Sequence, residues 1–306
     1  MTKAQLKQFI LDETFALGFD ICRVAKADFL EKEAPLLEKW LNNKMHGKMH
    51  YMENNFDKRL DPRKLVPGAK TVLTLVHNYT PKEKFEGKNR YKIAKYAYGR
   101  DYHKVLKKKL KILIGKIENV TGTLNGRAFV DSAPVMERQW AARSGAGWLG
   151  KNSLLLNRSM GSYFFLAEII SDLDLEPDPP IGEYCGTCTK CIEACPTEAI
   201  PLNGVVDASK CISYLTIELK DQIPEEFKGK FHDWIFGCDI CQDICPWNRF
   251  AKKHQEEAFF PKKIIEKYSK KEWEEITQEI FEKELNGSPI QRTGLNGLKR
   301  NIEFAK

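Results

Sequence analysis

The sequence predicts an α+β protein whose N-terminal part alternates strands and helices as α/β proteins do. Three observations support this. Short apolar runs and amphipathic stretches alternate up to about residue 172, eight of the nine cysteines fall between residues 185 and 245, and residues 262–306 are charged with helical periodicity. We therefore expect a chain with a well-buried sheet, a cysteine-rich region and a short helical tail.

The elements follow in order along the chain. Residues 4–17 place apolar side chains at helical spacing and stop at Gly18, and residues 103–120 form a second amphipathic pattern. In that second helix we expect Val105, Leu106, Leu110, Leu113 and Ile117 to face inward, and Lys107, Lys108, Lys109, Lys111 and Lys116 to face water. The expected strands are residues 19–24, 71–76, 128–130 and 163–170.

Proline-rich residues 176–182 (EPDPPIG) mark the main boundary. We predict three units: residues 1–175, 176–255 and 256–306. The net charge is +7, which permits a polyanionic partner without demonstrating one. Neither a spanning apolar stretch nor a signal-peptide core is present, and the cysteines have metal-ligand spacing, so we expect a cytoplasmic protein that does not enter a membrane.

The cysteine spacing indicates two [4Fe–4S] clusters. The first run is Cys185-x2-Cys188-x2-Cys191-x3-Cys195-Pro196, the pattern of bacterial ferredoxins, in which the fourth cysteine binds the other cluster. The second run, Cys238-x2-Cys241-x3-Cys245-Pro246, lacks one early cysteine, and Cys211 is available to replace it. The predicted ligand sets are therefore Cys185, Cys188, Cys191 and Cys245 for one cluster, and Cys195, Cys211, Cys238 and Cys241 for the other.

Two structural zinc sites are the alternative to these clusters. Zinc sites usually use paired C-x2-C hairpins, whereas here three cysteines follow one another at x2 spacing before C-P, which favours iron–sulfur. The ninth cysteine, Cys22, lies in an apolar run, where we expect a buried core thiol.

Residues 145–151 (GAGWLGK) partly match two nucleotide-binding motifs. The dinucleotide pattern would have to follow a strand, but here it follows a helix-like stretch, and the P-loop would need Ser or Thr where Asn152 stands. The segment is either a glycine-rich turn or a loop lying against a large flat cofactor, and we favour the second on the resemblance described next.

Several segments together resemble the epoxyqueuosine reductase family. They are residues 96–103 (YAYGRDYH), 131–138 (DSAPVMER), 145–152 (GAGWLGKN) and 211–218 (CISYLTIE), besides the cysteine runs. The resemblance implies a nitroreductase-like domain that binds cobalamin and does catalysis over residues 1–175, a ferredoxin-like two-cluster domain over 176–255, and a basic helical tail packing on the core over 256–306. Some members carry a further helical-repeat domain, which we expect to be missing here because the chain stops soon after residue 301.

The resemblance also implies the reaction and the acid. Epoxyqueuosine in the anticodon loop of tRNA would be reduced to queuosine, with electrons relayed through the clusters from an external low-potential donor to cobalamin. An acid must protonate the departing oxygen. The match selects Asp131, whose place at the end of an apolar run predicts burial and a raised pKa. Read without the match, Asp131 followed by Ser-Ala-Pro is a helix N-cap.

Contact residues are implied in the same way. For cobalamin they are Arg59, Asp131, Lys151, Asn152 and Ser213 with the backbone of Cys238 and Asp239, and for tRNA they are Arg100, Arg292, Lys299 and Arg300, with residues 107–111 as a weaker candidate. We expect a monomer. The alternatives are another corrinoid iron–sulfur reductase similar to reductive dehalogenases, and a non-enzymatic ferredoxin-type electron carrier, for which the large N-terminal part would have no use.

Overall fold

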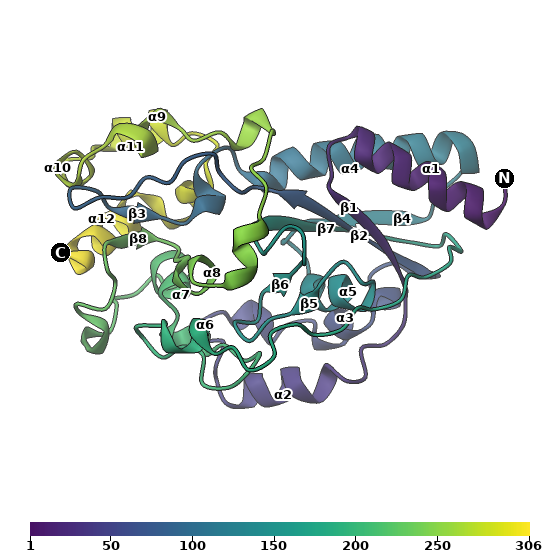
Figure 1. Ribbon diagram of the computed structural model, residues 1–306, viewed down its shortest axis with the longest axis horizontal. Coiled ribbons are helices and arrows are strands. Elements are labelled where there is room, and N and C mark those ends of the chain that lie inside the picture. Colours follow the sequence, from purple (N-terminus) through teal and green to yellow (C-terminus); the bar gives the residue numbers. More distant parts are fainter.

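A four-stranded antiparallel sheet forms the centre of the N-terminal part in the computed structural model, which describes residues 1–306 (Figure 1). The strands lie in the order β1-β2-β7-β4, with bounds Ile21–Lys26, Thr71–Asn78, Phe164–Ser171 and Gly126–Phe129. Every residue of β2 is buried, because the strand has neighbours on both sides and helices on both faces. The predicted strands are confirmed to within a few residues.

Two helices cover one face of the sheet. They are α1 (Lys3–Ala16), which starts with a capping box between Thr2 and Gln5, and α4 (Tyr102–Thr121), whose N-cap is Asp101. Of the α4 residues expected to face inward, all are buried except Val105, which is half-buried. The prediction that the α4 lysines face water is wrong for two of them. Lys109 and Lys116 are partly buried, because they pair with Glu256 and Glu13.

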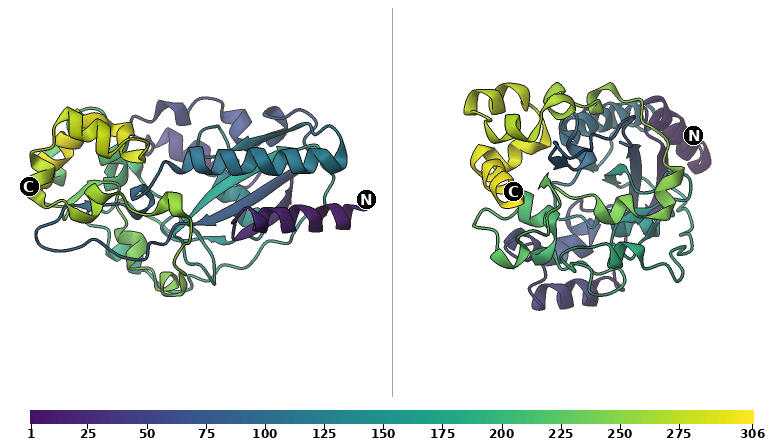
Figure 2. Two further views of the ribbon diagram at one scale, coloured as in Figure 1. Left: turned by 90° about the horizontal axis from the view of Figure 1, so that it is seen from above. Right: turned by 60° about the vertical axis from the view of Figure 1, so that its left-hand side comes forward.

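Three helices cover the opposite face: α2 (Ala34–Asn42), α3 (Phe56–Leu60) and α5 (Glu137–Arg143) (Figure 2). Their apolar side chains meet those of the sheet around Trp140, which is fully buried. A small hairpin, β5 (Trp148–Leu149) and β6 (Leu155–Leu156), continues from α5. The predicted α+β class is thus confirmed.

The cysteine region consists of short elements held between the sheet and the tail (Figure 1). It contains α6 (Lys190–Glu193), α7 (Ile212–Ile217), β8 (Trp234–Phe236) and α8 (Ile240–Asp243). The helices α6 and α8 each lie between cysteines of one run and contact each other. The two cysteine runs are therefore brought side by side.

The tail folds into α9 (Lys263–Lys267), α10 (Lys270–Glu274), α11 (Gln278–Glu284) and α12 (Gly294–Ala305). Its core includes residues from far earlier, among them Tyr91 and Tyr98, and the short strand β3 (Lys92–Ile93) pairs in parallel with β8. Segments from all three predicted units thus share one core, and the limits at residues 175 and 255 stay a prediction. None of the helices combines the length and the apolarity that crossing a bilayer requires.

Candidate active site

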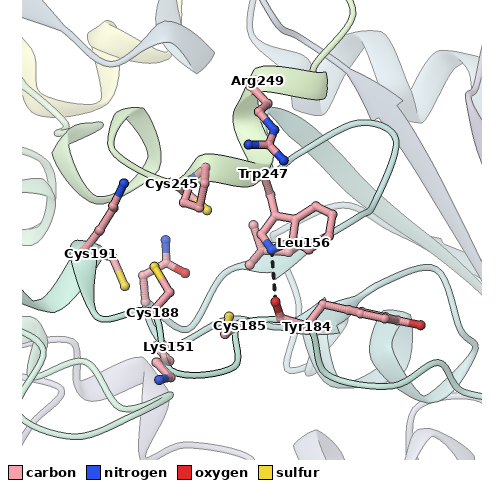
Figure 3. Close-up of a pocket in the computed structure, with 12 residues that line it drawn as sticks. Lys151, Leu156, Tyr184, Cys185, Cys188, Cys191, Cys245, Trp247 and Arg249 are labelled. Atoms are coloured by element: carbon pink, nitrogen blue, oxygen red, sulfur yellow. Dashed lines mark hydrogen bonds between the residues drawn. The ribbon is translucent and has the colours of Figure 1, made fainter.

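Four of the predicted ligands surround one small cavity of about 240 Å³ (Figure 3). Cys185, Cys188 and Cys191 come from the loop before α6 and from α6 itself, and Cys245 comes from the end of α8. Trp247 closes one side, and its indole N–H donates to the carbonyl oxygen of Tyr184 at 3.2 Å. The arrangement joins three cysteines of the first run to the last cysteine of the second, as the ligand prediction requires.

The other four predicted ligands form a second, more deeply buried group. Cys211 precedes α7, Cys238 and Cys241 flank the start of α8, and Cys195 follows α6. The thiols of Cys238 and Cys241 both interact electrostatically with that of Cys211, and Cys195 interacts with Cys211 and Cys241. Backbone N–H groups of Ser213 and Tyr214 also donate to the Cys211 sulfur.

The electrostatics of these groups suit iron–sulfur clusters. Burial raises the pKa of the Cys241 thiol, and the neighbouring Cys211 sulfur raises it further. Four thiolates packed so closely in a buried place repel one another, so they need a cationic centre that neutralises them. The donor set in each group consists only of sulfur, which fits a cubane.

A larger cavity of about 770 Å³ lies beside the second group. Cys211 and Ser213 line it on the cysteine side, while Asp131, Tyr102 and His103 line it on the side of the sheet domain. The rings of Tyr79, Tyr96, Phe164 and Phe165 add an apolar wall. The cavity could therefore hold a large ligand with a flat apolar body next to a buried cluster.

Asp131 lines this cavity and stands two residues after the end of β4. Its backbone is left-handed, with φ of 43°, and its carboxylate accepts a hydrogen bond from the Tyr102 hydroxyl at 2.5 Å. The predicted burial of this side chain is wrong, since 57 % of it is exposed. The helix-cap interpretation is wrong as well, because α5 begins only at Glu137, with Met136 as its N-cap and no capping bond from Asp131.

Two neighbours of Asp131 were missed by sequence reasoning. Burial and the nearby Asp131 charge both raise the pKa of Tyr102 well above that of a free tyrosine, so its hydroxyl remains a donor at neutral pH. The Nε2 atom of His103 lies 3.8 Å from the Asp131 carboxylate, while its Nδ1 atom is 2.7 Å from Asp101. Both residues stand in the YGRDYH segment, so the signal was present, but only the fold brings that segment to Asp131.

The cavity brings together only some of the residues predicted to contact cobalamin. Asp131 and Ser213 line it, but Lys151 and Asn152 line the smaller cysteine cavity, where Lys151 bonds to the Gly186 carbonyl at 2.8 Å. Arg59 is buried in α3, and its guanidinium donates to the Tyr51 carbonyl at 2.6 Å while its Nε atom has no partner. Lys151 and Asn152 therefore lie outside the lining of the larger cavity, and their contact with cobalamin stays a prediction.

Cys238 and Asp239, at the start of the second cysteine run, are not among the residues that line the larger cavity. The Asp239 carboxylate accepts the Lys95 backbone N–H at 2.8 Å, and Lys95 Nζ lies 3.3 Å away. Both side chains are buried, so Asp239 holds the strand-end segment of Lys95 against α8. Only the backbone of these two residues is left for a cofactor.

The glycine-rich segment supports the hairpin and lines neither cavity along its first glycines. A side chain at Gly147 would collide with the carbonyl oxygen of Leu156, and one at Gly145, where φ is 77°, would collide with that of Pro179. The glycines are needed because protein backbone approaches them closely. The segment is therefore a glycine-rich turn, and the expectation that it also lies against a flat cofactor stays a prediction.

The four predicted tRNA contacts have different surroundings. Arg292 lines the larger cavity, with its side chain half-exposed and 2.7 Å from the Glu218 carboxylate, and Arg100 and Lys299 are exposed. Arg300 is different, because its guanidinium donates to the carbonyls of Leu215 and Leu219 at the end of α7. Arg300 thus secures α7 to α12, and its role as a tRNA contact stays a prediction.

Family models and relatives agree with this site. Residues 184–248 match a model described as "4Fe-4S double cluster binding domain", and residues 59–132 match "Epoxyqueuosine reductase QueG, DUF1730". Proteins called epoxyqueuosine reductase are 61% identical over 95% of this chain in Leadbetterella byssophila and 42% identical over 98% in Escherichia coli, which covers 95% and 80% of those relatives. A crystal structure of epoxyqueuosine reductase with an epoxyqueuosine-modified tRNA-Tyr stem loop superposes with a TM-score of 0.93 at 29% identity, covering 99% of this chain and 81% of that one.

The fold and the site together define an iron–sulfur oxidoreductase with two [4Fe–4S] clusters beside a ligand cavity. More narrowly, the chain belongs to the epoxyqueuosine reductase family.

Proposed function

We propose that this protein reduces epoxyqueuosine in the anticodon loop of tRNA to queuosine, with cobalamin in the larger cavity. One observation carries this proposal: the 770 Å³ cavity has an acid-bearing wall at Asp131 and a cluster-bearing wall at Cys211. A pure electron carrier would need no such cavity. The overall change takes up two electrons and two protons and yields an alkene and water.

The residues present fit cobalamin. The aromatic wall matches the apolar body of a corrin ring, and the polar groups around the rim, among them Ser213 and Gln291, match its amide side chains. When bound, cobalamin supplies a strongly reducing cobalt centre that takes up electrons one at a time. The cobalamin contacts that we propose are those predicted from the sequence: Asp131, Ser213, Arg59, Lys151 and Asn152, with the backbone of Cys238 and Asp239.

The role of the protein groups follows from their places. Asp131 holds the proton for the departing epoxide oxygen, Tyr102 orients its carboxyl, and His103 lies within reach to restore the proton. A relative from Bacillus subtilis has been crystallised with its aspartate-bearing catalytic loop swung out of the active site. The half-exposed Asp131 in the cavity lining fits a loop that closes over its substrate.

The tRNA partner is proposed from exposed cations. Arg292 lines the larger cavity, Lys299 is exposed in the tail and Arg100 is exposed before α4, and these side chains would contact phosphates around the anticodon loop. The external electron donor would reach the first cysteine group, whose thiols are less buried than Cys211 and Cys241 of the second. We further propose that the protein acts as a monomer in the cytoplasm.

The test is a turnover measurement with defined components. Anaerobically purified protein, loaded with iron, sulfide and cobalamin and given a chemical reductant, should convert epoxyqueuosine in a tRNA-Tyr stem loop to queuosine. Protein with intact clusters but no cobalamin should not. No uptake of cobalamin by cluster-replete protein in equilibrium dialysis would contradict the proposal.

A further inference from the structure

Behind the Asp131 loop, a glutamate is buried in the middle of the sheet. Glu168 stands in β7 opposite Thr74 of β2 and Phe129 of β4, and none of its surface is exposed. Neither carboxyl oxygen receives a hydrogen bond from an N–H or a neutral hydroxyl group, and no lysine or arginine pairs with it. An ionised carboxylate in such a place would be very costly, so Glu168 must keep its proton.

The only polar partner of Glu168 is a second carboxyl group. Glu137, the first residue of α5, forms a side-chain hydrogen bond with Glu168, which requires a proton between the two. Glu137 also contacts the Asp131 loop, because its Oε1 atom accepts a hydrogen bond from the backbone N–H of Asp131 at 2.6 Å. The chain of contacts thus runs from the sheet core to the backbone of the catalytic loop.

The charges around the pair favour a shared proton. Burial and, after it, the negative charge of Asp131 raise the pKa of Glu137, while hydrogen bonds from the Asp131 N–H and from Glu168 and the charge of Arg138 lower it; the net pKa is about 8. Burial also raises the pKa of Glu168 well above its ordinary value, with Glu137 and Asp131 adding to the effect. The pair therefore holds at least one proton at neutral pH, as carboxyl dyads do.

The left-handed backbone conformation of Asp131 must be stabilised by contacts with its surroundings. A non-glycine residue with φ of 43° is uncommon and persists only where its surroundings impose it. The backbone N–H of Asp131 donates a hydrogen bond to Glu137, and its carboxylate accepts one from Tyr102. Both the backbone and the side chain of this residue are therefore fixed.

We propose that Glu137 and Glu168 form a proton-sharing carboxyl pair that positions the Asp131 loop: Glu168 supplies the proton, and Glu137 holds the Asp131 amide. The pair is a positioning device and touches neither substrate nor cofactor. This inference rests on the proposed role of Asp131, and its test must separate the two.

The first test measures the loop directly. Hydrogen–deuterium exchange of the peptide spanning residues 129–136 reports on the Asp131 amide in the cluster-loaded protein. Glu137→Leu removes the acceptor and should speed exchange of that amide at least tenfold, while Glu137→Gln keeps an acceptor oxygen and should leave it protected. Gln139→Leu, on the same helix but without a side-chain hydrogen bond, is the matched control and should not change it. Unchanged protection in Glu137→Leu would overturn the proposal.

The second test uses turnover. With iron content and cobalamin binding confirmed, Glu137→Leu should lower kcat by about 100-fold because the acid is misplaced, whereas KM for the tRNA should change little. Glu137→Gln should restore most of the rate. If Asp131→Asn proves fully active while Glu137→Leu still loses amide protection, the positioning stands and the role of Asp131 as the acid fails. Equal, mild losses in Glu137→Leu and Glu137→Gln would contradict positioning.

The third test looks for the shared proton. A protonated, buried carboxyl group absorbs in the infrared at a carbonyl frequency separate from that of carboxylates and amides. The wild-type protein should show this band at pH 7, and Glu168→Gln should remove it while keeping loop protection, since the Gln amide donates permanently to Glu137. A wild-type spectrum without the band would show that the pair is ionised and would refute the proton-sharing model.

Discussion

At the scale of single residues, Asp131 shows how a functional group depends on its surroundings rather than on its own neighbours in sequence. Its carboxylate is exposed and is held by Tyr102, and its amide is held by Glu137. The burial that the sequence predicted for this side chain is absent. In the proposed reaction, bound substrate and cofactor would cover it, and excluding water disfavours the charged form of a carboxyl group.

Replacing Asp131 by Asn separates an acid from a merely structural side chain. Asn preserves the shape and can accept the Tyr102 hydrogen bond, but it has no proton to deliver at the required acidity. We expect Asp131→Asn to fold, to keep both clusters and to bind cobalamin, yet to lose about two to four orders of magnitude in epoxide reduction. Single-turnover rates with confirmed cofactor content measure this. Near-normal turnover would exclude the role of Asp131 as the acid.

The Glu137–Glu168 pair predicts how stability depends on pH. In the unfolded chain both glutamates lose their protons above the ordinary glutamate pKa, whereas the folded protein keeps protons on the pair. The stabilisation that the raised pKa values give is therefore complete below about pH 4.4. It is lost progressively as the pH rises toward the folded pKa of Glu137, about 8. Because Gln cannot ionise, Glu168→Gln should gain stability relative to the wild type, by roughly 1 to 3 kcal/mol between pH 6 and pH 9. Chemical denaturation at both pH values checks this, and a constant difference would argue against the pair.

At the scale of elements, each of the two cysteine runs supplies ligands to both predicted clusters. The contact between α6 and α8 places Cys245 with the first run and Cys195 with the second, so in the predicted ligand sets each cluster takes cysteines from both runs. Cys211, which precedes α7, lies both in the second group and in the wall of the larger cavity.

Cys211→Ala should therefore damage one cluster and spare the other. We expect iron content to fall from about eight per chain toward about four, since one cubane loses a ligand. Electron paramagnetic resonance of the reduced protein should retain the signal of one cluster. Cys22→Ala is the control, because that thiol is buried among core side chains far from both groups in the sequence. If Cys211→Ala keeps all its iron, the ligand assignment is wrong.

At the scale of the whole molecule, the larger cavity is lined jointly by the sheet domain, the cysteine region and the tail. The C-terminal tail lies at the opposite end of the molecule from the N-terminus (Figure 1). Arg292 and Lys299 both belong to this tail, although Arg292 already pairs with Glu218. A net charge of +7 strengthens the attraction of a polyanion without selecting its site.

Binding of tRNA should fall steeply with salt, because phosphate contacts release counterions. Arg292→Gln should weaken binding and lower the slope of log affinity against log salt by about 1. Arg127→Gln, an exposed cation on the edge strand β4, should leave both unchanged. Fluorescence anisotropy with a labelled stem loop at several salt concentrations measures this. Equal effects of the two variants would show that only net charge matters.

The sequence by itself determined the elements and the cofactor class. Buried strands such as residues 71–78, the capped helix after Asp101 and the cysteine spacing are local patterns, and local patterns depend on neighbouring residues alone.

The tertiary structure decided the rest. Arg300, a predicted phosphate contact, bonds to backbone carbonyls, and Lys151 belongs to the smaller cavity. Glu168 looked like an ordinary strand residue, yet only the packing of α5 onto β7 gives its carboxyl a partner and buries it away from water. Such roles depend on which distant groups the fold places within a few ångströms, and a linear pattern does not contain that information.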